Sequence, residues 1–220
     1  MATLTAVPTG RSDYRFAGWA AIASGVACAT FLLGLLAFLL MPPQFRTPEV
    51  RDILQPINIV ALLLQALFLI PAAFALHTLG RRRCAKASIV AVTVAVIALA
   101  AIVVVRALLL LYRETTPDIL FMGPMGFVGL WLIVVNWLLA GVLSTPVRIV
   151  GALAGLGLVI LGASFFFLGG LAVLTEGPGA VATDVDFHIG IRSGGLPGLF
   201  LLSIWTILVG RRLLRMEDPR

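Results

Sequence analysis

The chain has 220 residues, of which 60% are hydrophobic and only 12% charged, and its formal net charge is +6 at pH 7. Soluble domains carry about 25% charged residues, and a folded domain of this size could not hide so many apolar side chains in one core. The composition therefore excludes an ordinary soluble domain. Because the basic residues flank apolar segments, they indicate membrane topology, and we expect no nucleic-acid partner.

Six stretches of the chain each hold the roughly 20 predominantly apolar residues that a transmembrane helix needs. Their apolar residues occupy every face, whereas strands of a membrane barrel would alternate polar and apolar positions. We predict an all-α fold, a polytopic membrane protein with one six-helix domain over residues 1–220. The predicted helices are 16–41, 54–79, 87–112, 119–143, 147–174 and 187–210. The first is longer than a signal-peptide core of about 7–15 residues, so we expect it to stay as an anchor.

Basic residues gather at alternate connections between these helices. An excess of Lys and Arg marks the cytoplasmic side of a membrane protein. We therefore predict that both termini are cytoplasmic, in a bacterial inner membrane, with the acidic residues mostly outside and membrane lipids as partners. The basic residues on the predicted inner side are Arg11, Arg15, Arg81, Arg82, Arg83, Lys86, Arg148, Arg211, Arg212, Arg215 and Arg220.

The second predicted helix carries amides along one stripe. Asn58 and Gln65 are seven residues apart, and Gln55 precedes Asn58 by three, so all three lie near one helical face. Amides in a membrane helix commonly bond to neighbouring helices, each worth about 0.6 kcal/mol on average. The alternative is that they line a polar cavity.

The third predicted helix contains a permanently charged residue, Arg106, six positions before Tyr112. At about 1.5 Å per residue, Arg106 would lie roughly 9 Å below the outer boundary. A guanidinium on its long aliphatic stem can reach water across much of that distance. The alternative is that Arg106 faces the bundle interior as part of a functional site.

The fifth predicted helix contains small residues that would allow close helix packing. Gly151, Gly155 and Gly162 lie near one face, and small residues let two backbones approach in lipid. We favour contact with another helix of the same chain, and a homodimer face is the alternative.

The sixth predicted helix begins with DFHIGIRSGGLPG, in which Arg192 would lie roughly 8 Å below the outer boundary, at the depth of Arg106. His188 stands one turn earlier on the same face. Two arginines at one depth repel unless an anion lies between them. The anion would be either an acidic residue of the outer loops or a bound anionic small molecule, such as a lipid phosphate or a carboxylate.

Catalytic signatures are missing from the sequence. There is no HExxH, P-loop or nucleophile elbow, and Cys28 and Cys84 are too few for a metal cluster or a disulfide framework. We predict no catalytic residue, no metal site and no cofactor.

Two segments resemble a family known only by its topology. RFAGWAAIASGV at the start of the first helix and GLPGLFLLSIWTILVGRRLLR at the end of the chain are similar to segments of uncharacterised bacterial six-helix membrane proteins, a domain of unknown function. The resemblance implies a six-helix topology and brings no functional residues with it.

Three functions remain open. The first is a non-enzymatic subunit or accessory protein whose helices pack against a second copy or a membrane partner. The second is a small-molecule or lipid carrier with an anion-binding pocket near the outer leaflet, built on Arg106, Arg192, His188, Gln65 and Asn58. The third is a membrane-embedded lipid-modifying enzyme that uses the outer acids and His188 as acid–base groups.

Overall fold

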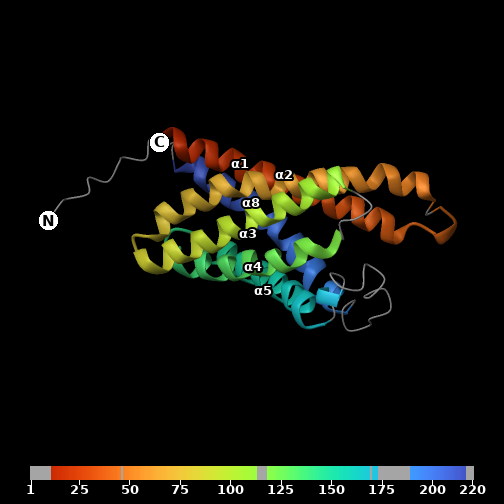
Figure 1. Cartoon of the computed structure of the whole chain (residues 1–220). Coiled ribbons are helices and arrows are strands. Elements are labelled where there is room, and N and C mark those ends of the chain that lie inside the picture. The colour runs from red at the N-terminus through yellow and green to blue at the C-terminus, as the bar shows by residue number, and fades with distance from the viewer. Residues whose placement is uncertain (1–10, 46, 113–117, 169, 173–188, 217–220) are drawn as a thin grey trace.

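A computed structural model describes residues 11–45, 47–112, 118–168, 170–172 and 189–216 of the chain. The described residues form six long helices, and Figure 1 shows that the long helices pack side by side as a bundle. They are α1 (Arg11–Leu40), α2 (Pro48–Gly80), α3 (Ala85–Leu111), α4 (Met122–Leu138), α5 (Thr145–Phe167) and α8 (Leu196–Arg215). Short helical turns, η1 (Pro43–Phe45), η2 (Asp118–Phe121), η3 (Gly170–Ala172) and the π-helical η5 (Ile191–Gly195), lie between them.

The described residues contain six helices long and apolar enough to cross a membrane, which confirms the predicted all-α polytopic fold. Large apolar side chains stay exposed on the outside of the bundle, among them Ile97, Leu156 and Phe200. Lipid is the medium in which such an apolar surface is stable, because the hydrocarbon offers no hydrogen bonds and the backbone groups along each spanning helix bond to one another.

Several helices begin or end at residues other than the predicted ones. The second helix starts at Pro48 because a proline suits the first helical turn and Glu49 there complements the helix dipole. The fourth ends at Leu138, since Gly141 adopts a φ of 96° in the turn that follows. The fifth ends at Phe167, and the last continues to Arg215 because its cationic residues suit a helix C-terminus.

Each helix contacts its neighbours in a closed ring, in the order α1, α2, α3, α4, α5, α8, with α8 returning to α1. Because the helices lie side by side, the connections between them gather at two ends of the bundle (Figure 1). The "termini end" holds the start of α1, the α2–α3 turn, the α4–α5 connection and the end of α8. The "loop end" holds η1, η2, η5 and the start of α2.

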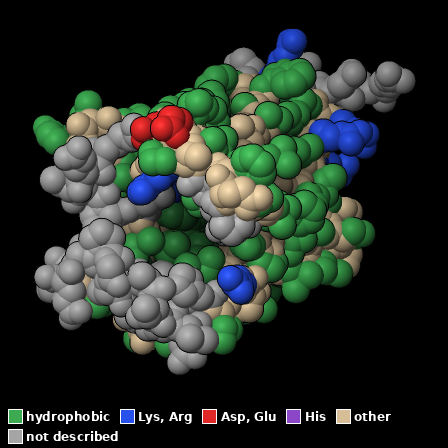
Figure 2. All heavy atoms as spheres, turned by 90° about the vertical axis from the view of Figure 1, so that its right-hand side faces the viewer, with side chains coloured by type: hydrophobic (Ala, Val, Ile, Leu, Met, Phe, Trp, Pro, Cys, Tyr) green, Lys and Arg blue, Asp and Glu red, His purple; other side chains and the backbone are tan. Residues whose placement is uncertain are grey.

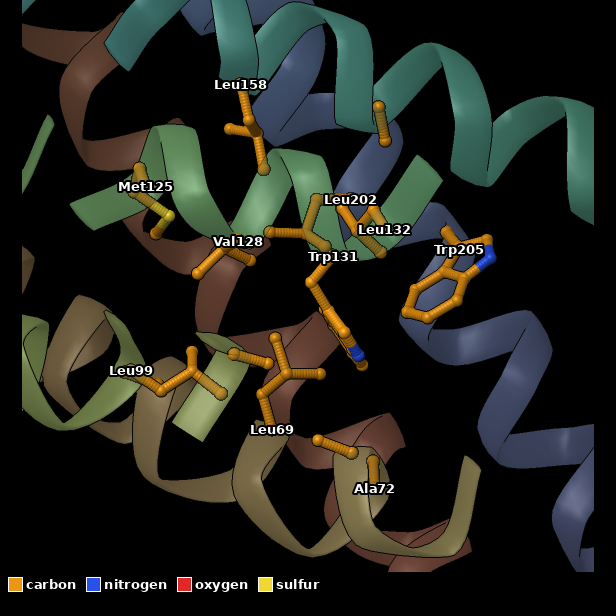
Figure 3. Close-up of a cluster of buried hydrophobic side chains, with 14 of the residues drawn as sticks. Leu69, Ala72, Leu99, Met125, Val128, Trp131, Leu132, Leu158, Leu202 and Trp205 are labelled. Carbon is orange, nitrogen blue, oxygen red and sulfur yellow. The ribbon is translucent and has the colours of Figure 1, made fainter. Parts of the chain in front are cut away.

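The middle of the ring is filled with buried side chains from several helices (Figure 3). Trp131 of α4 and Trp205 of α8 meet edge to face, with ring centroids 6.0 Å apart. The Trp205 indole donates a 3.0 Å hydrogen bond to the Asn136 Oδ1 atom, and the Asn136 side-chain amide donates to the Leu132 carbonyl at 2.8 Å. Asn136 thus has partners for both ends of its amide, and it ties α4 to α8 in the interior.

Candidate functional site

A cavity of about 470 Å³ opens at the loop end, inside the ring of helices; we call it the loop-end pocket. Figure 2 views the bundle from this end and shows a hollow with apolar side chains on its floor and basic side chains at its margin. The volume lies in the range of typical ligand pockets, about 300–1,000 Å³. The pocket is lined by Phe31, Leu35, Phe38, Arg51, Leu54, Gln55, Asn58, Ile119, Phe121, Met122, Ile191, Arg192 and Leu196.

The walls of the loop-end pocket are mainly apolar. Helix α1 contributes Phe31, Leu35 and Phe38, and η2 contributes Phe121. The Phe31 and Phe121 rings meet edge to face with centroids 6.2 Å apart, so α1 and η2 are joined at the cavity wall. Such walls suit a hydrocarbon chain.

The polar groups of the pocket come from α2 and η5. Arg51, Gln55 and Asn58 follow one another by four and three residues, which places them on one face of α2. Arg192 lies across the cavity on η5, and both arginines are exposed. Among the described side chains, no carboxylate forms an ion pair with Arg51 or Arg192. The pocket therefore combines apolar walls with two cations at its mouth.

The π-helical turn of η5 places Arg192 on this cavity. Its wider hydrogen bond runs from the Leu196 amide to the Ile191 carbonyl. Pro197 follows directly, and a proline cannot donate the α-helical bond to the residue four positions before it. Such π turns are frequent at functional sites.

Arg106 lies inside the bundle and does not reach the lipid face. Its side chain is 1% exposed, and the guanidinium carbon lies 4.1 Å from the centroid of the Phe121 ring. A desolvated cation over an aromatic face contributes about 2 kcal/mol or more. Phe121 also lines the loop-end pocket, whereas Arg106 does not, so Arg106 packs behind the pocket wall and Arg192 lines the pocket itself.

Asn58 lines the pocket and packs against the bare backbone of Gly34 on α1. A Cβ atom at Gly34 would collide with the Asn58 side-chain amide. The buried Asn58 Oδ1 atom accepts no hydrogen bond from another described residue. The amide thus lies at the α1–α2 contact with an acceptor atom that no described residue uses.

Gln65 lies two turns deeper on the same face of α2 and is completely buried. Ser24 of α1 donates a 2.9 Å hydrogen bond to the Gln65 backbone carbonyl. Within the described part of the chain, both atoms of the Gln65 side-chain amide lack a hydrogen-bond partner. Gln65 is not among the residues that line the loop-end pocket.

The three glycines singled out in the fifth helix face other helices of the same chain. A Cβ at Gly155 would lie 2.7 Å from the Gly129 carbonyl oxygen, and one at Gly162 would lie 2.5 Å from the Gly126 Cα. Gly151 faces the side chains of Asn136 and Trp205.

His188 lies outside the described residues, as do Glu114, Glu176, Asp184 and Asp186. The described residues contain no group of three or more His, Cys, Asp or Glu side chains that could hold a metal ion.

Sequence reasoning did not single out Arg51 as a site residue. An arginine in the first turn of a membrane helix looks like a topology determinant, and only the packing of α2 across from η5 puts it beside the same cavity as Arg192. The spacing of Arg51, Gln55 and Asn58 was the available signal, because it continues the amide stripe outward by one turn.

The fold and the cavity define the class of this chain, a polytopic membrane protein with a pocket at one end of its helix bundle. No family model, no curated protein and no solved structure matches it. The likeness to uncharacterised six-helix membrane proteins therefore extends to the six helices and identifies no family.

Proposed function

We propose that this membrane protein binds an anionic amphiphile, such as a long-chain carboxylate, in the loop-end pocket and acts as its carrier, without catalysis. One observation carries the proposal: two arginines without a carboxylate partner among the described residues lie at the mouth of a cavity with apolar walls. An anionic head would bind Arg51 and Arg192 through charge-assisted hydrogen bonds. The hydrocarbon chain would lie against Phe31, Leu35 and Phe121.

We further propose that the loop end faces the outside and the termini end faces the cytoplasm of a bacterial inner membrane. The support is the charge distribution, because Arg81, Arg82, Arg83 and Lys86 lie at the α2–α3 turn of the termini end. The amphiphile would then enter from the outer leaflet.

The test uses the purified full-length protein in a neutral detergent and a palmitate analogue with a diazirine in its chain. After photolysis, we expect crosslinks in the segments 31–38 and 119–122, located by peptide mass spectrometry. The double variant R51Q/R192Q should weaken binding about 25-fold, at about 1 kcal/mol for each lost charge. Binding by R81Q/R82Q, with the same charge change at the opposite end, should be nearly unchanged.

Competition supplies the second half of the test. Unlabelled palmitate should displace the probe, and the neutral alcohol of the same chain length should displace it far less. Crosslinks that fall outside the pocket, or equal competition by the neutral alcohol, would reject the proposed function.

A groove on the outside of the bundle favours a second candidate, a subunit that packs against a second copy of itself. The groove lies between α1 and α2, has a volume of about 650 Å³, and includes Ala23, Ala27 and Thr30. Small residues allow another helix to approach closely in lipid. Ala27→Leu should then convert a dimer to a monomer in native mass spectrometry without changing the palmitate crosslinks. A wild type that is already monomeric would reject this candidate.

The enzymatic alternative depends on His188 and the outer acids. Since they lie outside the described residues, no structural observation favours it.

A further inference from the structure

A second cavity, of about 510 Å³, opens at the opposite end of the molecule; we call it the termini-end pocket. It lies between the α4–α5 connection, the first turn of α5 and the last turns of α8. Its lining residues are Gly141, Val142, Leu143, Ser144, Val147, Leu208, Arg211, Arg212 and Arg215. None of them lines the loop-end pocket, so the two cavities are separate.

Three arginines of α8 line the termini-end pocket. Arg211 and Arg215 are four residues apart, and like charges at this spacing repel each other on a helix. None of the three guanidiniums forms a hydrogen bond or an ion pair with another described residue. The carboxylates whose side chains the structure describes, Glu49 and Asp52, belong to the first turns of α2 at the loop end. Within the described residues, the three cations therefore have no counter-ion.

Other arginines at the termini end bind protein groups. Arg83 donates a 2.9 Å hydrogen bond to the Trp137 carbonyl, and its guanidinium carbon lies 4.8 Å from the centroid of the Trp137 ring. The Arg148 Nε atom donates a 2.9 Å hydrogen bond to the Asn136 carbonyl. Basic residues at this end can thus bind backbone carbonyls of the bundle. The three arginines of α8 differ, because their side chains line a cavity.

The rest of the pocket supplies features that suit a phospholipid. Helix α5 begins here, and its N-cap residue Ser144 makes no side-chain capping bond, so its hydroxyl is available to a ligand. The start of a long helix carries a partial positive charge that favours phosphate. The apolar part of the wall consists of Val142, Leu143, Val147 and Leu208.

We propose that the termini-end pocket binds the phosphate headgroup of an anionic phospholipid from the adjacent leaflet. Arg211, Arg212 and Arg215 contact the phosphate, and Leu208 and Val147 contact the start of the acyl chains. Basic pockets between transmembrane helices bind anionic lipid headgroups in this way. The site is independent of the amphiphile bound at the loop end.

The test is native mass spectrometry of the full-length protein in a neutral detergent, titrated with dioctanoyl phosphatidylglycerol. Each basic residue near an anionic headgroup raises affinity about five-fold, so R211Q/R212Q/R215Q should bind about 100-fold more weakly than wild type. The matched control is R81Q/R82Q/K86Q, which removes the same charge from the same end without touching the pocket. It should bind within a few-fold of wild type.

A second variant keeps the charges and blocks the space. Leu208→Trp should also weaken binding of the phosphatidylglycerol by ten-fold or more, while gel filtration reports whether it stays folded. Equal losses in the α8 triple variant and its matched control would overturn the proposal, since they would show only diffuse attraction. Equal affinity for dioctanoyl phosphatidylcholine would also overturn it, and full competition by millimolar inorganic phosphate would overturn the assignment to a lipid.

Discussion

Gln65 is the residue whose burial carries the clearest energetic cost. Its side chain is fully buried in α2, and both amide atoms lack a hydrogen-bond partner among the described residues. An unsatisfied buried polar group costs about 1–3 kcal/mol. Asn136, by contrast, satisfies both ends of its amide through Trp205 and Leu132. Two buried amides in one bundle thus make opposite contributions to stability.

We predict that Gln65→Leu raises the free energy of unfolding by about 1–2 kcal/mol, because leucine fills a similar volume without leaving polar atoms unsatisfied. The melting temperature in detergent should rise, at about 2–4 °C per kcal/mol for a chain of this size. Gln65→Glu should lower it, since a buried charge is costlier still. A lower melting temperature for Gln65→Leu would show instead that the amide binds a water molecule or ligand.

At the residue scale, the polar residues within apolar runs could be identified from the sequence, but the groups that they contact could not. Asn58 and Arg192 line one cavity, whereas Arg106, at a similar predicted depth, packs on Phe121. A side chain's depth follows from its position along its own helix. Its partner follows from the arrangement of all six helices, which local spacing does not contain.

At the scale of elements, α4 and α5 pack more closely than they could if the residues at their contact had side chains. Gly126 faces Gly162, and Gly129 faces Gly155, so the two backbones touch directly. Dispersion contacts between close backbones help to drive helix association in lipid. The stripe of glycines in α5 could be seen in the sequence, but its partners on α4 required the structure.

We predict that Gly155→Ala destabilises the bundle by about 1–3 kcal/mol, because the new methyl group would force α5 away from the Gly129 carbonyl. Leu156→Ala is the matched control on the same helix, since Leu156 is exposed on the lipid face. Thermal unfolding in detergent should separate the two variants. Equal stabilities would mean that the close contact contributes little.

The positions of the helices along the chain were predictable, because a long apolar run in lipid can hardly form anything other than a helix. The residues at which the helices begin and end were not predictable. Pro48 and Glu49 extend α2 outward beyond the apolar run, and the same extension carries Arg51 to the pocket mouth. The start of the last helix was also not predictable. The π turn at η5 depends on Pro197 and on close packing against α5, where Gly157 faces Gly194.

At the scale of the whole molecule, the bundle has a cavity at each end and a packed middle. Trp131, Trp205 and their buried neighbours fill the interior between the loop-end and termini-end pockets (Figure 3). A ligand in one pocket is therefore separated from the other by close-packed side chains. Passage of an amphiphile across the bundle would require these helices to move apart.

We predict from the distribution of basic residues that the termini end is cytoplasmic. In a Cys28→Ala, Cys84→Ala background, single Arg82→Cys and Arg212→Cys variants should both be protected from a membrane-impermeant maleimide in intact cells. Glu49→Cys, at the loop end, should react. Labelling of Arg82→Cys and Arg212→Cys before lysis would reverse the orientation, and labelling of only one of them would contradict the six-helix crossing pattern.

The contact between Arg106 and Phe121 also constrains how the chain is made. On the ribosome, Arg106 emerges before residue 121, so for a short time α3 must enter the translocon without the ring that covers its guanidinium. An arginine deep in a helix raises the free energy of insertion by up to about 2.5–3.5 kcal/mol. The strongly apolar remainder of α3 offsets that penalty, and insertion of α3 and α4 together as a hairpin would bury the charge in a single step.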